Sequence, residues 1–182
     1  MKFTLREKRF PSATGLCDIR YRMWIPEDPH AALQITHGMA EHIDRYEEFA
    51  SFLAENGILV YGNDIVSHGK SIRDGVPKGY FGEKNGWDNV VQDMRTIREL
   101  VKADYPGIPF ILLGHSMGSF LARTYAGRDG ADFDAFIFSG TAGSNPVLGI
   151  GKLIAKSEIK KTGGKQPSIT LFNMSFGSYN KA

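Results

Sequence analysis

A pentapeptide of the pattern Gly-x-Ser-x-Gly constrains the fold more than any other feature of this sequence. It reads Gly114-His115-Ser116-Met117-Gly118, and it stands between the apolar run Pro109–Leu113 and the helical pattern Ser119–Gly127. A serine at a sharp strand-to-helix turn is presented as a nucleophile at the carboxyl edge of a sheet, and flanking glycines leave the room that the turn needs. The helix N-terminus also stabilises developing negative charge. We therefore interpret Ser116 as a nucleophile in an α/β fold.

The rest of the first 140 residues alternates strand and helix patterns. Strands are predicted at Phe3–Arg9, Leu16–Ile25, Ala31–Thr36, Ile58–Tyr61, Pro109–Leu113 and Phe133–Phe138, and helices at Arg45–Asn56, Trp87–Tyr105 and Ser119–Gly127. Asp44 is predicted to cap the helix that follows it, and Gly57 to end that helix. Strands and helices at this spacing predict a doubly wound α/β fold with a mostly parallel sheet.

The character of the sequence changes after Gly140. Val147, Ile150 and Ile154 share one helical face, and a basic face is formed by Lys152, Lys156, Lys160 and Lys161. We predict two parts: residues 1–140 as the N-terminal part of the core, and residues 141–182 as the beginning of a cap or lid. We expect the apolar stripe to pack on the core. The alternative is a weak contact of the cap with a membrane surface.

Composition excludes several classes of protein. A 42% hydrophobic and 23% charged sequence is typical of a globular domain, and a net charge of +2 gives no footprint for nucleic acid. The single Cys17 excludes an intramolecular disulfide and fits a reducing compartment. No apolar run approaches the roughly 18 residues of a membrane span, and the first ten residues lack the apolar segment of a signal peptide. We expect a cytoplasmic protein without a cofactor.

A second motif, His37-Gly38-Met39-Ala40-Glu41-His42, directly follows the predicted strand Ala31–Thr36. Acyl transfer needs two N–H donors for the oxyanion, one after the nucleophile and one in the loop after a neighbouring strand. A turn at His37 and Gly38 can point the Met39 N–H at the place that the Met117 N–H faces. The two motifs together predict an oxyanion hole formed by the backbones of Met39 and Met117.

Three segments in order carry a family resemblance. They are HGMAEHIDRY, DIVSHGKS and LLGHSMGS, and with them the chain resembles the monoacylglycerol lipase and lysophospholipase branch of the α/β-hydrolases, the serine aminopeptidase S33-type hydrolases. The resemblance runs over roughly residues 10 to 180 and includes a cap-like tail, FNMSFGSYNKA. It implies an α/β-hydrolase fold, Ser116 as the nucleophile, and a monoacylglycerol or lysophospholipid as the substrate. One departure is Ser67, where the family usually has glycine.

The other histidines of these motifs are expected to support the loops. His42 and His68 are expected to hold their own loops by hydrogen bonds rather than to act as general bases, and His115 to point away from Ser116. His37, His42 and His68 lack the spacing of metal ligands on a helix, so no metal site is expected.

Two acidic residues of the motifs are also assigned local roles. Glu41 is expected to form an ion pair with Arg45, four residues later. Asp64 could orient a histidine, but the family resemblance implies a structural role for it at the end of a strand.

The sequence lacks a general base in the usual place. In this fold an acid and then a histidine follow the nucleophile, but no histidine follows His115; the acids after Ser116 are Asp129, Asp132, Asp134 and Glu158. We expect the chain to be the N-terminal portion of a longer hydrolase and to be inactive alone, rather than a whole protein that lost catalysis. We also expect an open sheet edge at Phe133–Phe138, which favours aggregation or a dimer along that edge.

These observations predict a serine hydrolase that cleaves carboxylic esters through an acyl-enzyme on Ser116, with an acyl ester or lipid as its small-molecule substrate. Two alternatives stay open. One is a peptidase or amide hydrolase of the same fold, since the fold does not determine which bond is cleaved. The other is a non-catalytic module that binds a small molecule.

Overall fold

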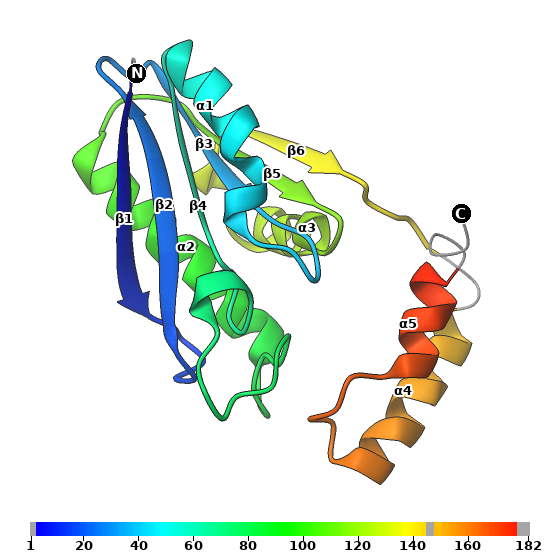
Figure 1. The fold of residues 1–182 in the computed structure, drawn as a ribbon. Helices are drawn as coiled ribbons and strands as arrows, with labels where there is room; N and C mark the ends of the chain where they lie inside the picture. The colour runs from blue at the N-terminus through cyan, green and yellow to red at the C-terminus, as the bar shows by residue number, and fades with distance from the viewer. Residues whose placement is uncertain (1–2, 145–147, 178–182) are drawn as a thin grey trace. The chain divides into compact units, whose positions relative to one another are not determined.

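The computed structural model describes residues 3–144 and 148–177 (Figure 1). Within them, one sheet contains β1 (Phe3–Pro11), β2 (Asp18–Pro26), β3 (Ala31–Thr36), β4 (Ile58–Asn63), β5 (Phe110–His115) and β6 (Ala135–Ser139). The α-helices are α1 (Glu47–Glu55), α2 (Gly86–Asp104), α3 (Met117–Asp129), α4 (Leu148–Thr162) and α5 (Ile169–Phe176). Short 3₁₀ helices lie at η1 (Ile43–Tyr46), η2 (Gly69–Ser71) and η3 (Gly130–Asp132).

The sheet is mixed, and its strands follow the order β1-β2-β4-β3-β5-β6. β1, β2 and β4 pair antiparallel, and β4, β3, β5 and β6 pair parallel. The predicted doubly wound, mostly parallel α/β fold is therefore confirmed, with an antiparallel hairpin at one edge. The long pairing of β1 with β2 starts at Phe3 opposite Pro26 and ends at Pro11 opposite Asp18.

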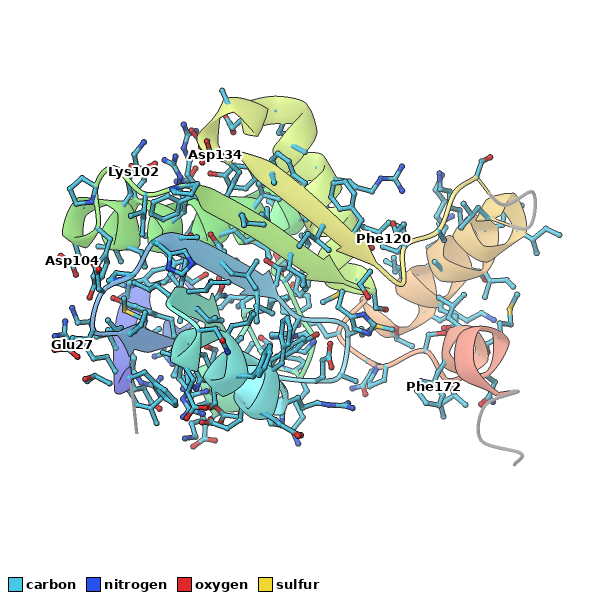
Figure 2. All side chains as sticks on the ribbon, turned by 90° about the horizontal axis from the view of Figure 1, so that it is seen from above. Glu27, Lys102, Asp104, Phe120, Asp134 and Phe172 are labelled. Atoms are coloured by element: carbon cyan, nitrogen blue, oxygen red, sulfur yellow. The ribbon has the colours of Figure 1, made fainter. Side chains whose placement is uncertain are left out.

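Helices cover both faces of the sheet. Figure 2 shows α1 on one side of the strands, and α2 and α3 on the other. Successive residues of a strand point to opposite faces, so each central strand contributes to two cores. In β4, Leu59 and Tyr61 are buried in one core with Met94 of α2, whereas Val60 is buried in the other with Ala50 of α1. This double burial explains the nearly continuous apolar runs of the parallel strands.

The helix predicted at Arg45–Asn56 begins later, at Glu47, after η1. The prediction that Asp44 caps it is wrong: the residue before α1 is Tyr46, which makes no side-chain capping bond. The Asp44 carboxylate lies instead 2.8 Å from the Arg20 guanidinium. A buried charge without a partner costs more free energy than an uncapped helix end, so the ion pair is favoured. Gly57 follows the helix with φ +82°, as predicted for a residue that ends it.

The chain divides into two compact units, Met1–Thr141 and Ala142–Ala182. The second contains α4 and α5, and the Ser168 side chain accepts a hydrogen bond from the Leu171 N–H at the start of α5. Of the predicted apolar stripe, Val147 lies outside the described residues, and Ile150 is exposed. The end of the cap-like tail, residues 178–182, also lies outside them.

No helix within residues 3–144 and 148–177 combines the length and the apolar character needed to cross a membrane.

The carboxyl ends of the parallel strands meet at one edge of the sheet. Thr36 at the end of β3 is opposite Gly114 of β5, and His115 is opposite Ser139 at the end of β6. The loops that follow β3, β4, β5 and β6 therefore start side by side. In open α/β sheets this edge is where ligands bind.

Candidate active site

Ser116 lies at the sharp turn between β5 and α3 and has an unusual backbone conformation, φ +51° and ψ −118°. A Cβ atom on Gly114 would collide with the Gly118 carbonyl oxygen, and one on Gly118 would collide with the Thr36 carbonyl oxygen. The turn therefore requires both glycines. The Ser116 N–H donates to the Ser139 carbonyl oxygen at 2.9 Å, which ties the turn to the end of β6.

Ser119, in the first turn of α3, stabilises the turn at Ser116 by hydrogen bonds. Its hydroxyl and its N–H both donate to the Ser116 carbonyl oxygen, at 2.6 and 2.9 Å. Sequence reasoning missed this residue, because a serine in the first turn of a predicted helix gives no signal of its own. Met117 is the first residue of α3, where an N–H has no partner within the helix, and it has no other acceptor among the described residues.

The loop after β3 passes directly beside the nucleophile. A Cβ atom on Gly38 would lie 3.1 Å from the Cβ of Ser116. The structure thus brings the two sequence motifs together at one edge of the sheet. Met39, the next residue, has a half-exposed side chain, and its N–H has no acceptor within residues 3–144 and 148–177.

His37 is fully buried at the start of this loop, and both of its ring nitrogens are engaged. The Ile65 N–H donates to His37 Nε2 at 2.9 Å, so Nε2 carries no hydrogen. The hydrogen is therefore on Nδ1, which donates to the Gly38 carbonyl oxygen at 2.7 Å. Burial lowers the pKa of His37 to about 4, and the ring is neutral at pH 7.

Glu41 closes the same loop. Its Oε1 accepts hydrogen bonds from the Gly38 N–H and, at 3.1 Å, from the Tyr46 hydroxyl. The expected ion pair is also present, with Arg45 Nε 3.6 Å from Glu41 Oε2. Burial, followed by the charge of Glu41, raises the pKa of Tyr46, so its hydroxyl stays a donor.

Asp64 is fully buried after β4 and joins three segments. Its Oδ1 accepts from the Ile43 N–H at 2.9 Å, and its Oδ2 accepts from the Lys70 N–H at 2.8 Å. Arg20 Nη1 lies 3.3 Å from Oδ2. Sequence reasoning missed Arg20, which is buried on β2; an arginine within the apolar part of a predicted strand was the available signal.

The loop from residue 64 to residue 69 contains the departure from the family pattern. Ser67 has φ +62°, a conformation that glycine adopts more easily, and its hydroxyl donates to the Tyr80 carbonyl oxygen at 2.9 Å. Next to it, His68 Nδ1 donates to the Val66 carbonyl oxygen at 3.0 Å, and burial lowers the pKa of this histidine. The serine therefore preserves the turn and adds a hydrogen bond to it.

The other two histidines of the motifs do not contact the nucleophile's hydroxyl. His115 Nδ1 lies 3.2 Å from the Ser139 hydroxyl oxygen, toward β6. The His42 carbonyl oxygen accepts a hydrogen bond from the Arg45 N–H, but the ring has no hydrogen-bond partner among the described residues, so the ring does not hold the loop as expected. Within residues 3–144 and 148–177, the Ser116 hydroxyl has no partner either.

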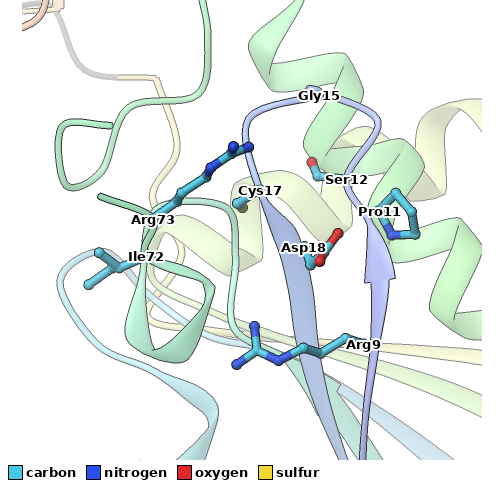
Figure 3. Close-up of a pocket in the computed structure, with 8 residues that line it drawn as sticks. All are labelled: Arg9, Pro11, Ser12, Gly15, Cys17, Asp18, Ile72 and Arg73. Carbon is cyan, nitrogen blue, oxygen red and sulfur yellow. The ribbon is translucent and has the colours of Figure 1, made fainter. Parts of the chain in front are cut away.

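A hollow of about 450 Å³ has none of the predicted site residues in its lining (Figure 3). Its lining comes from the β1–β2 hairpin and from residues 72–73, and it includes Cys17. Burial raises the pKa of the Cys17 thiol, which disfavours the reactive thiolate. No cluster of three or more histidine, cysteine, aspartate or glutamate side chains in the described part of the chain is arranged to hold a metal ion.

Similar proteins include lipases and esterases. The chain is 33% identical over 160 residues to a monoacylglycerol lipase of Mycolicibacterium smegmatis. This match covers 84% of this chain and 55% of that protein. It is 32% identical over 158 residues to the monoglyceride lipase of Homo sapiens, covering 86% of this chain and 48% of that protein. The chain thus spans about half the length of these relatives.

Solved structures share the fold. A thermostable carboxyl esterase from Bacillus coagulans matches 98% of this chain and 58% of its own chain, with a TM-score of 0.86 and 30% identity. A monoglyceride lipase variant from Saccharomyces cerevisiae has a TM-score of 0.62 at 21% identity, over 89% of this chain and 54% of its own. Residues 27–174 match the family described as serine aminopeptidase, S33. The chain therefore belongs to this family of α/β-hydrolases.

Proposed function

We propose that the protein hydrolyses carboxylic esters and that Ser116 is its nucleophile. The observation that carries this proposal is the close approach of Gly38 to Ser116, because Met39 directly follows Gly38 in the chain and its N–H has no acceptor among the described residues. Ser116 Oγ bonds to the acyl carbon, the carbonyl oxygen becomes an oxyanion, and the alcohol then leaves. The N–H groups of Met39 and Met117, which have no acceptor among the described residues, receive the oxyanion.

No histidine among the described residues contacts the Ser116 hydroxyl, whose proton a base must take up. Both nitrogens of His37 are engaged, and His115 contacts Ser139. No histidine follows His115 in the sequence. We propose that an acid and a histidine of the complete protein take up this role, so that the 182-residue chain alone turns over very slowly. The same histidine returns the proton to the leaving alcohol, and water then hydrolyses the acyl-enzyme.

The proposed substrate is a monoacylglycerol or a lysophospholipid. This choice rests on the family resemblance and on relatives named as monoacylglycerol and monoglyceride lipases. The second unit suits weak contact with an anionic lipid surface, because Leu153 of α4 and Ile169 of α5 are exposed and α4 also carries lysines. That contact is part of the proposal, as is the cap role of residues 141–182.

A hydrolysis assay with the protein expressed from its complete coding sequence tests the choice of substrate. We expect it to cleave monoacylglycerols and p-nitrophenyl esters of varied acyl length faster than aminopeptidase substrates, and Ser116→Ala to abolish this activity. The family description names an aminopeptidase, so peptide cleavage is the second candidate function. Preferred cleavage of peptides would support that candidate, and ligand binding without turnover would support a non-catalytic module.

A further inference from the structure

Both backbone polar groups of Gly38 are held by side chains of its own loop. The Gly38 N–H donates to Glu41 Oε1, and the Gly38 carbonyl oxygen accepts from His37 Nδ1 at 2.7 Å. The two peptide planes that meet at Gly38 are therefore fixed from opposite ends of the loop. A glycine has no side chain to restrain its backbone, so these two bonds determine its orientation.

Holding the Gly38 carbonyl also determines where the Met39 N–H points. A trans peptide is planar, and its C=O and N–H point in opposite directions. The Gly38 oxygen is turned toward the buried His37 ring, so the Met39 N–H is turned the other way. That N–H has no acceptor among the described residues, and the neighbouring Gly38 lies against Ser116.

Glu41 and His37, which together form a clamp on Gly38, are themselves held by other groups. The Tyr46 hydroxyl donates to the same Glu41 oxygen at 3.1 Å, and the Ile65 N–H donates to His37 Nε2 at 2.9 Å. The clamp is thus supported from η1 and from the loop after β4. Neither support makes a hydrogen bond to the nucleophile.

We propose that Glu41 and His37 are positioning residues of the oxyanion hole, because together they aim the Met39 N–H at the reacting carbonyl oxygen. This inference rests on the proposed ester hydrolysis and on the role of Met39 in it. Neither side chain touches the substrate in this account. Since an oxyanion exists only in the transition state and the tetrahedral intermediate, a badly aimed donor lowers kcat and leaves KM nearly unchanged.

Glu41 gives the cleaner test, because a matched set of variants is available. Glu41→Ala removes the acceptor of the Gly38 N–H, and Glu41→Gln retains an acceptor oxygen without the charge. Glu48→Ala is the control, since Glu48 is an exposed glutamate of α1. The variants are made in the protein expressed from its complete coding sequence, and kcat, KM and the melting temperature are measured with a p-nitrophenyl ester.

We expect Glu41→Ala to lower kcat by about 10- to 100-fold with KM changed by less than about twofold, since a lost oxyanion donor costs at least that much. Glu41→Gln recovers most of the rate, and Glu48→Ala matches the unaltered protein. A Glu41→Ala variant with unchanged kcat, or with a change in KM alone, overturns the proposal. The proposal is also overturned if Glu41→Gln loses as much kcat as Glu41→Ala while its melting temperature is unchanged.

The same assay separates this inference from the proposed function. Ester hydrolysis that Ser116→Ala abolishes supports the function, and the Glu41 variants then decide the clamp. Hydrolysis that survives in Ser116→Ala contradicts the proposed function, and the clamp's role in catalysis is then also wrong.

Discussion

Gly38 lies between Ser116 and Glu41 with no room for a side chain. A Cβ atom at Gly38 would stand 3.1 Å from the Ser116 Cβ and 2.7 Å from Glu41 Oε1. The second of these distances is too short for any real contact, so the Glu41 carboxylate would have to move away from the Gly38 N–H. The space beside the nucleophile thus depends on a glycine at this position.

We predict that Gly38→Ala lowers kcat by at least about tenfold, because displacing a clamped loop by a fraction of an ångström misplaces the oxyanion donor. Overpacking also costs about 1–3 kcal/mol in the free energy of unfolding, measured by urea denaturation. Gly127→Ala is the matched control: this glycine is in α3, a Cβ there meets nothing within 4 Å, and alanine favours the helix. Equal activity and stability of the two variants would show that the contact at Gly38 is not tight.

The backbone conformation of Ser116 predicts a gain in stability from glycine. Its φ of +51° with ψ −118° is a combination that glycine adopts readily and other residues adopt at a cost of about 1–3 kcal/mol. Ser116→Gly should therefore unfold at a higher urea concentration than Ser116→Ala. The expected difference in the free energy of unfolding is about 1 kcal/mol, after the greater freedom of glycine in the unfolded chain is subtracted. Both variants lack the nucleophile, so only the backbone differs. Equal stability would mean that the turn stores no strain.

Ser67 offers the same comparison in a place without a nucleophile. Ser67→Ala loses the hydrogen bond to the Tyr80 carbonyl but keeps a side chain at φ +62°, and we expect it to lose about 1 kcal/mol. Ser67→Gly loses the same bond and relieves the backbone, so it should be near neutral. Thermal denaturation of the two variants measures the difference. A glycine variant less stable than the alanine variant would contradict this account of the turn.

His37 predicts a loss of stability in acid. Its pKa is about 4 in the folded protein and about 6.5 when unfolded, so between these values only the unfolded chain takes up the proton. The contribution of His37 to the free energy of unfolding is complete above pH 6.5 and is lost as the pH falls toward 4, by about 3 kcal/mol in total. His68 acts in the same direction.

Asp93 opposes this effect, because burial raises its pKa to about 6 and folding is then disfavoured as the pH rises from 4 to 6. The contribution of His37 is therefore measured as the difference between the unaltered protein and His37→Asn, by urea denaturation from pH 4 to pH 7. We expect a shallower loss toward acid in His37→Asn. Parallel curves for the two proteins would contradict a buried neutral His37.

The outer edge of β6 predicts self-association of the 182-residue chain. β6 is the last strand in the sheet order, and Ile137 and Phe138 are 46% and 40% exposed. A strand with one unpaired edge and apolar side chains is a template for a second chain. We expect sedimentation to show dimers or aggregates, and Ile137→Lys to increase the fraction of monomer. A monodisperse, cooperatively melting monomer of the unaltered chain would contradict this.

Local patterns predicted most of the elements and the order of the motifs. The run Ala31–Thr36 is apolar because both faces of β3 are covered, and the predicted strand matches β3 residue for residue. The strand order was not readable, since β4 lies between β2 and β3 only because of the tertiary packing. Burial of Arg20 was missed for a related reason: it follows from three acids, Glu7, Asp44 and Asp64, that approach it from other segments.

The candidate site was predicted as two motifs, and the structure adds how one supports the other. The ion pair of Glu41 with Arg45 could be predicted from their spacing of four residues. The bond from the Gly38 N–H to Glu41 could not, because it depends on a loop whose conformation includes Ala40 at φ +59°. The bond from Ile65 to His37 joins two loops 28 residues apart, and local sequence does not specify such a contact.

Covalent labelling tests the nucleophile most directly. The protein expressed from its complete coding sequence is treated with a fluorophosphonate, and the modified peptide is identified by mass spectrometry, with Ser116→Ala as the control. We predict a single adduct on Ser116, formed at neutral pH, absent from Ser116→Ala and blocked by prior incubation with a monoacylglycerol. An active esterase that carries its adduct on another residue, or that labels equally well in Ser116→Ala, would contradict the account.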